Sequence, residues 1–302
     1  MKLAASFSRF KNLGPLFIMA LKKWYNRDPF REGAIIAYNA IFAIPGLLVV
    51  AITIAGYFFG DVAVSGHLHK QIAEAVGDNT ANQLEGILTI SIQNKDSYWA
   101  TIIGIIVIII GATTVFVELQ KSLNIIWEVK ATTKKSGLFV FLKTRLFSFG
   151  LILSIAFLLL ISLLLSTFLS ALGSWMQQFW SESLLSVFQW LNFLFSVGLI
   201  TLLFAMMFKI LPDAKIKWHS VWIGTFVTAL LFVIGKTALG LYFGKANPGS
   251  AYGAAGSIIL VLLWTSYSSM IVFFGAEFTK VYSDFYYGEI APTENAVKKK
   301  NR

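Results

Sequence analysis

Long apolar runs separated by short polar stretches dominate this sequence. Several runs, including residues 98–117, 147–172 and 184–208, reach the roughly 20 residues that a helix needs to cross a hydrocarbon core. They lack the regular alternation of barrel strands, so helices remain as the spanning structure. The pattern predicts an all-α integral membrane protein with six transmembrane helices, over residues 34–60, 98–127, 146–175, 184–211, 218–243 and 254–282.

Three polar segments accompany the predicted membrane domain, which covers residues 34–282. Residues 1–33 place apolar side chains at helical spacing with most lysines on other faces. This predicts an amphipathic helix that either lies at the membrane interface or packs, solvated, on the base of the bundle. The acidic residues 61–97 predict one or two extracytoplasmic amphipathic helices between the first two spans. Residues 283–302 end in a basic run and are expected to be disordered.

Charge sets the orientation of these spans. Only 13% of the 302 residues are charged, against roughly 25% in soluble domains. With the N-terminus in the cytoplasm, 21 basic residues fall inside and three fall outside, which satisfies the positive-inside rule. The sequence therefore predicts a multi-pass protein of the bacterial cytoplasmic (inner) membrane with both termini cytoplasmic. The net charge of +10 indicates loops that face anionic lipids and not a nucleic-acid partner.

Familiar catalytic arrangements are missing from the sequence. There is no cysteine, and the three histidines, His67, His69 and His219, have no third metal ligand at a useful spacing. No phosphate-binding loop or nucleophile elbow is present. We therefore expect no catalytic residue, no metal, no cofactor and no enzymatic activity, with membrane lipids as the partners.

Polar side chains inside the predicted spans are the strongest functional signal, because their burial in lipid is costly. Most of them lie toward the cytoplasmic ends of the spans, and one lysine lies in the outer half. The candidate intramembrane polar or substrate site comprises Asn39, Glu118, Lys121, Asn124, Lys236 and Glu277.

Two interpretations of this set remain open. In the first, a polar cavity opens to the cytoplasm, where an acidic pair binds a cation or a proton while Lys236 meets an anionic headgroup. In the second, these groups cap helices, pair with one another, as Glu118 and Lys121 do at i,i+3, or extend to the interface.

Other residues indicate how the spans bend and pack. Pro45 inside the first span predicts a kink. Small residues at four-residue spacing predict close helix contacts, although the serines would also suit a wet path. The predicted packing positions are Gly56, Gly60, Ser162, Ser166, Ser170, Gly240, Gly244, Gly253 and Gly256.

Five short motifs, in order along nearly the whole chain, resemble the YihY family of bacterial inner-membrane proteins, also called virulence factor BrkB and once labelled ribonuclease BN. They are Ala37-Tyr38-Asn39-Ala40-Ile41-Phe42-Ala43-Ile44-Pro45, Leu123-Asn124-Ile125-Ile126-Trp127, Leu211-Pro212-Asp213, Ala251-Tyr252-Gly253-Ala254-Ala255-Gly256 and Gly275-Ala276-Glu277-Phe278. Asn39 and Ile44 depart from the aromatic residues common in the family. The resemblance implies six spans with both termini inside, and links to envelope integrity and lipid export.

The sequence therefore favours a transporter-like protein that assists translocation or export of a lipid-like or amphipathic envelope component. A non-catalytic scaffold that maintains the envelope is the alternative. An enzyme acting on lipid headgroups ranks third, and a ribonuclease last, because no metal or acid–base pair able to cut RNA is assembled.

Overall fold

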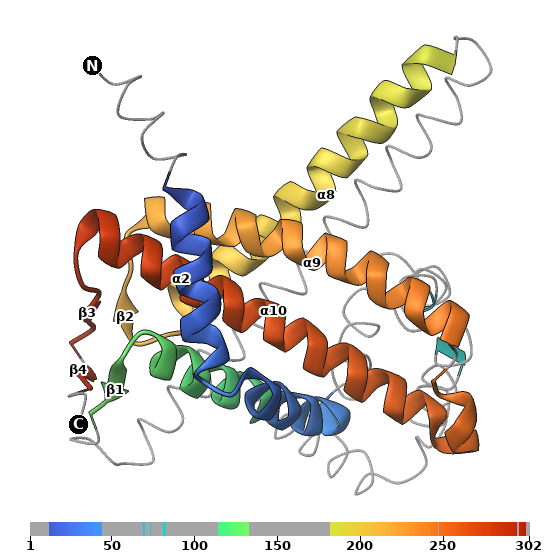
Figure 1. Cartoon of the computed structure of the whole chain (residues 1–302), viewed down its shortest axis with the longest axis horizontal. Coiled ribbons are helices and arrows are strands. Elements are labelled where there is room, and N and C mark those ends of the chain that lie inside the picture. The colour runs from blue at the N-terminus through green and yellow to red at the C-terminus, as the bar shows by residue number, and fades with distance from the viewer. Residues whose placement is uncertain are drawn as a thin grey trace, which may run out of the picture.

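Three long helices form the framework of the computed structural model: α8 (Glu182–Ile210), α9 (Trp218–Ala246) and α10 (Gly256–Tyr287) (Figure 1). Each contains an apolar segment long enough to cross a membrane, and they match the fourth, fifth and sixth predicted spans. The structure describes residues 12–43, 69, 73, 81–82, 114–132, 182–246, 248–294 and 296–299.

The other three predicted spans fall wholly or largely outside the described residues, so the count of six stays a prediction. Helices over residues 29–43 and 114–126 belong to the first and second of them. Residues 61–97 also lie almost entirely outside. The same is true of Pro45, Gly56, Gly60, Ser162, Ser166 and Ser170.

Interlocking glycines and threonines bring the antiparallel helices α9 and α10 together. A Cβ added to Gly224 would overlap Thr279, and a Cβ added to Gly275 would overlap Thr228. Each threonine hydroxyl donates to the glycine carbonyl one turn earlier in its own helix, at 2.7 Å. The hydroxyls are thereby satisfied without leaving the helix, and the backbones approach closely, as small residues allow in membranes.

The glycines selected from the sequence lie at the other end of this helix pair, near the 3-10 helix η2 (Ser250–Ala255) that joins α9 to α10. A Cβ on Gly256 would overlap the carbonyl oxygen of Gly249. Gly253 lies within η2, and Gly240 is half-buried on α9. No described atom lies within 4 Å of a Cβ added to Gly244, so the described residues offer no packing partner there.

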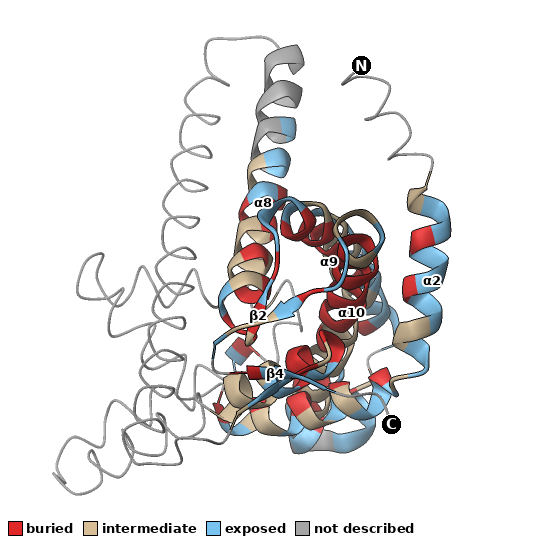
Figure 2. Ribbon diagram, turned by 90° about the vertical axis from the view of Figure 1, so that its left-hand side faces the viewer, coloured by how far each residue is buried: buried red, intermediate tan, exposed pale blue. Residues whose placement is uncertain are grey.

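Helix α2 (Leu13–Tyr25) lies across the C-terminal half of α10 (Figure 1). Leu16 and Ala20 are buried against Phe274, Phe278 and neighbouring side chains of α10. Most of the remaining surface of α2 is exposed (Figure 2). The helix thus packs on the last span, as one of the two interpretations expects, while its contact with a membrane interface stays a prediction.

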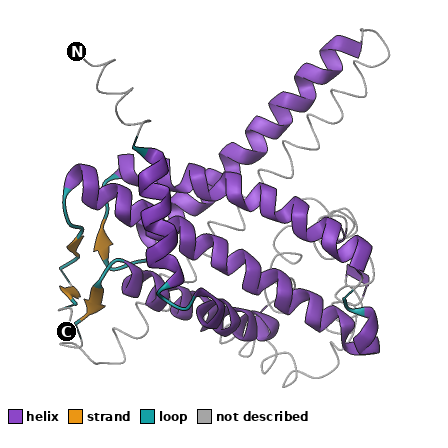
Figure 3. Ribbon diagram, viewed as in Figure 1, coloured by secondary structure: helices purple, strands orange, loops and turns teal. Residues whose placement is uncertain are grey.

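Four short strands lie at one end of the molecule (Figure 3). β1 (Val129–Ala131) pairs with β4 (Ala296–Lys298), and β2 (Ala214–Lys215) pairs with β3 (Ala291–Pro292), both antiparallel. We expected the tail from residue 283 to be disordered and the fold to be entirely helical. Instead, α10 continues to Tyr287, and the tail binds two distant loops through backbone hydrogen bonds.

The main hydrophobic core lies next to these strands. Trp127 packs edge-on against Phe208, with ring centroids 5.8 Å apart. Leu123, Ile216 and Val221 are fully buried beside them. The second predicted span, the α8–α9 connection and the start of α9 are therefore held together at the end of the bundle where α10 finishes.

Candidate functional site

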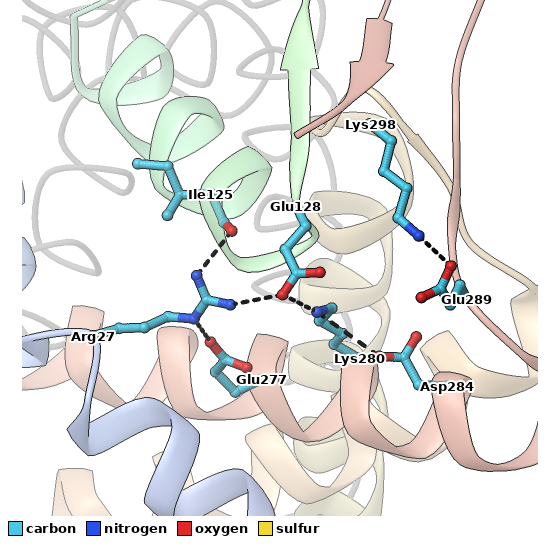
Figure 4. Close-up of polar contacts among 8 residues, drawn as sticks. All are labelled: Arg27, Ile125, Glu128, Glu277, Lys280, Asp284, Glu289 and Lys298. Carbon is cyan, nitrogen blue, oxygen red and sulfur yellow. Dashed lines mark hydrogen bonds and ion pairs between the residues drawn. The ribbon is translucent and has the colours of Figure 1, made fainter. Parts of the chain in front are cut away.

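Five charged residues meet at the C-terminal end of α10, and we call them the ion-pair cluster: Arg27, Glu128, Glu277, Lys280 and Asp284 (Figure 4). Three come from α10 itself, where a spacing of three and then four residues places them on one face. Arg27 follows α2, and Glu128 precedes β1. The cluster therefore connects the last span to two segments that are far away in the sequence.

Arg27 bridges the three parts through its guanidinium group. Its Nε forms an ion pair with Oε1 of Glu277. Its Nη1 donates to the carbonyl oxygen of Ile125 at 3.0 Å, and its Nη2 lies 3.4 Å from Oε1 of Glu128. The rigid fork of arginine suits this role, because it presents several donors in fixed directions.

Lys280 continues the chain of alternating charges. Its Nζ lies 2.7 Å from Oε1 of Glu128 and 3.8 Å from Oδ2 of Asp284. The side chain of Lys280 is only 6% exposed. Two cations thus share the carboxylate of Glu128, which is the central acceptor of the cluster.

Glu128 is held in place by its backbone and by its charge partners. Its φ of 57° lies in the left-handed region, which is uncommon for a residue of this type and points to a turn imposed by its surroundings. Burial opposes ionisation of the carboxyl, but the hydrogen bond from Lys280 and the positive charges of Lys280, Arg27 and Lys23 outweigh it. Together they lower the pKa of Glu128 below its ordinary value.

Glu277 is the most deeply buried member of the cluster, with 1% of its side chain exposed. Its Oε2 accepts no hydrogen bond from any residue that the structure describes. It borders a small pocket of about 40 Å³. Nine residues line this pocket: Trp24, Arg27, Pro29, Glu32, Ser122, Ile125, Ile126, Phe273 and Glu277. Four of these nine are polar or charged. Within the pocket wall, Ser122 donates to Glu32 at 2.8 Å.

Asn124 has a separate and well-defined position. Its Nδ2 donates to Oδ2 of Asp213, and its Oδ1 accepts from the backbone nitrogen of Asp213, both at 2.8 Å. Asp213 lies in the turn between α8 and α9, and its carbonyl oxygen accepts from the backbone of Thr293 at 3.0 Å. Asn124 thus fastens the 114–126 helix to the α8–α9 turn, which in turn holds the tail.

The other candidate residues do not gather around Glu277. Glu118 pairs with Lys121 of its own helix at 3.1 Å, and Lys121 is largely exposed. Asn39 donates to the carbonyl oxygen of Ile35, one turn earlier in the same helix, at 2.8 Å.

Lys236 is half-buried on α9, remote from the cluster. Since Gly224 faces Thr279 and Gly275 faces Thr228, Glu277 is level with residue 226. Lys236 therefore lies ten residues farther along α9, or about 15 Å.

The sequence identified Glu277 and missed the other four members of the cluster. The spacing of Glu277, Lys280 and Asp284 was a usable signal, because it predicts one polar face on a helix. Nothing local marked Arg27 or Glu128, which come from segments with many other charges.

Among the residues that the structure describes, no three histidine, aspartate or glutamate side chains gather in a way that would hold a metal ion.

Comparison with known proteins agrees with the membrane architecture. A UPF0761 membrane protein of Tolumonas auensis is 26% identical over 262 residues, which cover 85% of this chain and 81% of the relative. A UPF0761 membrane protein of Pseudoalteromonas atlantica is 24% identical, covering 84% and 81%. One from Rhodospirillum centenum is 27% identical, covering 90% and 58%.

No solved structure matches the chain. The family profile described as Virulence factor BrkB matches residues 20–300, which is almost the whole chain and includes every member of the ion-pair cluster. Together with the apolar helices α8, α9 and α10, this match shows that the chain is a membrane protein and belongs to the Virulence factor BrkB family.

Proposed function

We propose that this protein is a non-enzymatic, transporter-like protein of the bacterial inner membrane that assists translocation or export of a lipid-like or amphipathic envelope component. In this proposal both termini and the ion-pair cluster face the cytoplasm, in accordance with the distribution of basic residues. The cluster then lies where a substrate from the cytoplasmic leaflet would enter or leave.

The observation that carries the proposal is the burial of charge on a candidate span next to a pocket that is lined partly by polar side chains. Glu277 and Lys280 are almost fully buried on α10. Replacing a buried ion pair with well-packed apolar residues is often neutral or stabilising, so stability alone gives little reason to keep one. Ionisable residues within spans commonly mark substrate or ion pathways. A role in transport accounts for both the charges and the pocket.

A scaffold of the envelope is the second candidate, and the pairing of the polar residues favours it. Glu118 pairs with Lys121, Asn124 pairs with Asp213, and Glu277 pairs with Arg27. Such pairs also fasten helices and loops to one another. A scaffold requires these contacts to stay closed, whereas a transporter requires at least one of them to open.

Lipid translocation in reconstituted vesicles distinguishes the two candidates. Vesicles would carry a fluorescent phospholipid, and an impermeant reductant would quench only the outer leaflet. We expect the wild-type protein to speed the loss of protected fluorescence and Glu277→Ala to slow it. Glu289→Gln is the matched control, because Glu289 is exposed and pairs with Lys298 outside the cluster. If the wild type behaves like protein-free vesicles, the transport proposal is wrong, and a loss of envelope integrity in cells that carry Glu277→Ala would then favour the scaffold.

A further inference from the structure

Glu277 lies among charged groups from several parts of the chain. Among the described residues, Glu128 and Asp284 belong to the same ion-pair cluster, and Glu32 lines the same pocket as Glu277. Three cations act on Glu277: Lys23 from α2, Arg27 from the following loop and Lys280 from α10 itself. Arg27 and Lys280 also pair with Glu128, so Glu277 shares both of them. A carboxylate buried this deeply is costly unless it is fully paired.

Glu277 is the member best placed to accept a compensating proton. Glu128 already receives two cations, Arg27 and Lys280. Asp284 also has one buried oxygen, Oδ1, without a hydrogen-bond partner among the described residues, but its side chain as a whole is 28% exposed. Glu277 is 1% exposed and pairs with Arg27 through one oxygen. Its other oxygen has no hydrogen-bond partner among the described residues, and the side chain borders the pocket.

The pocket supplies a route and a partner for that proton. Its volume of about 40 Å³ exceeds the roughly 10–15 Å³ that a cavity needs to hold one water molecule. Glu32 and Ser122 lie in its wall and form a hydrogen bond with each other. Water held there would deliver a proton to Oε2 and accept a hydrogen bond from the protonated carboxyl.

Arg27 connects this site to α2. Arg27 lies just after the end of α2. Its guanidinium binds Glu277, Glu128 and the carbonyl oxygen of Ile125. The remaining polar contacts between α2 and α10 are modest. Trp24 donates to the carbonyl oxygen of Met270 at 3.0 Å, and Asn12 lies 3.4 Å from the hydroxyl of Tyr286.

We propose that Glu277 and the adjoining pocket form a proton-binding site, and that the arrival of the proton loosens α2 from α10. Protonation adds one hydrogen to Oε2 and removes the negative charge that holds the Nε of Arg27. Arg27 then keeps only Glu128 and the backbone carbonyl, and α2 depends on its packing and on the contacts of Trp24 and Asn12 with α10. The site is a property of this chain whether or not it moves a lipid, and it would supply proton coupling if it does.

Because the chain contains no cysteine, a single thiol introduced into α2 can be labelled without any background reaction. Ala20→Cys places a single reporter thiol on the fully buried face of α2. Gly14→Cys places one at an exposed position of the same helix, where no described atom lies within 4 Å of an added Cβ. The ratio of their maleimide labelling rates in lipid nanodiscs reports the release of α2, and comparing the ratio between the wild type and the variants below removes the dependence of thiol reactivity on pH.

We expect this ratio to rise roughly tenfold between neutral and acidic pH, as the loss of a buried charge partner would produce. With Glu277→Gln, which mimics the protonated carboxyl, the ratio should be high at both pH values. With Glu289→Gln it should follow the wild type. The proposal would be overturned if the labelling ratio of the wild type did not change with pH, or if Glu277→Gln showed the full pH response.

Infrared difference spectra provide a second test that does not depend on α2. Subtracting the acid-induced spectrum of Glu277→Gln from that of the wild type should leave the carbonyl stretch of one protonated carboxylic acid. Identical acid-induced carbonyl bands in the two proteins would place the proton elsewhere and refute the site. Neither experiment requires transport, so a failure here is distinct from a failure of lipid translocation.

Discussion

Replacing Arg27 with methionine tests how strongly the ion-pair cluster supports the fold. The substitution keeps a long apolar stem and removes the guanidinium from Glu277, Glu128 and Ile125. Because the side chain of Glu277 is 1% exposed, its carboxylate would be buried without its partner. Breaking a buried pair in this way costs about 3–5 kcal/mol. Protonation of Glu277 would relieve part of the cost, so we expect about 3 kcal/mol.

A double-mutant cycle isolates the contribution of the pair. Glu277→Gln alone should cost about 1 kcal/mol, because Arg27 retains two acceptors and contact with water. The double variant Arg27→Met with Glu277→Gln leaves no buried charge unpaired and should cost about 2 kcal/mol, which makes the coupling about 2 kcal/mol.

Unfolding in mixed micelles with increasing dodecyl sulfate, followed by tryptophan fluorescence, measures these free energies. Agreement of the double variant with the sum of the single variants to within about 0.5 kcal/mol would show that the two residues do not interact. A cost below about 0.5 kcal/mol for Arg27→Met would show that the ion pair is not important for stability. Either result would refute the reasoning.

Three further predictions concern other parts of the structure. Gly275→Val should destabilise the protein by about 1–3 kcal/mol, since its Cβ would overlap a threonine of α9, whereas Gly244→Val should stay within about 0.5 kcal/mol in the same unfolding assay. Asn124→Ala should cost about 1–3 kcal/mol and loosen the α8–α9 turn, because Asp213 loses two hydrogen bonds; hydrogen exchange at that turn measures the effect. The stabilisation due to the lowered pKa of Glu128 should be complete above its ordinary pKa and disappear as the pH falls through the lowered one. Melting temperatures as a function of pH should therefore show this acid loss in the wild type and less of it in Glu128→Gln.

Hydropathy predicted the last three spans because it reflects a local requirement. A helix that crosses lipid needs about 20 apolar residues in a row, and α8, α9 and α10 each contain such a run. Helix α10 continues five residues beyond residue 282, the predicted end of the sixth span, to Tyr287. The extra turn contains Tyr286 and Tyr287, which pack with α2 and its neighbours, and this contact is not visible in a local pattern.

The site was only partly predictable for the same reason. The cost of a carboxylate within a span identified Glu277, but its partner Arg27 lies 250 positions earlier in the chain. The order of the tail was missed because the partners of residues 291–298 are backbone groups of two distant loops. This strand pairing forms only where the helices have placed those two loops beside the tail.

By itself, the sequence determined that this protein lies in a membrane, where its last three spans run and which buried residues would be costly. These properties follow from the transfer of side chains and backbone groups into lipid, which each segment experiences on its own. Only the tertiary structure decided that α2 crosses α10, that Arg27 meets Glu277, and that the tail forms strands. Those outcomes depend on the close approach of α9 and α10 at Gly224 and Gly275, and on ion pairs between segments that only the folded chain brings together.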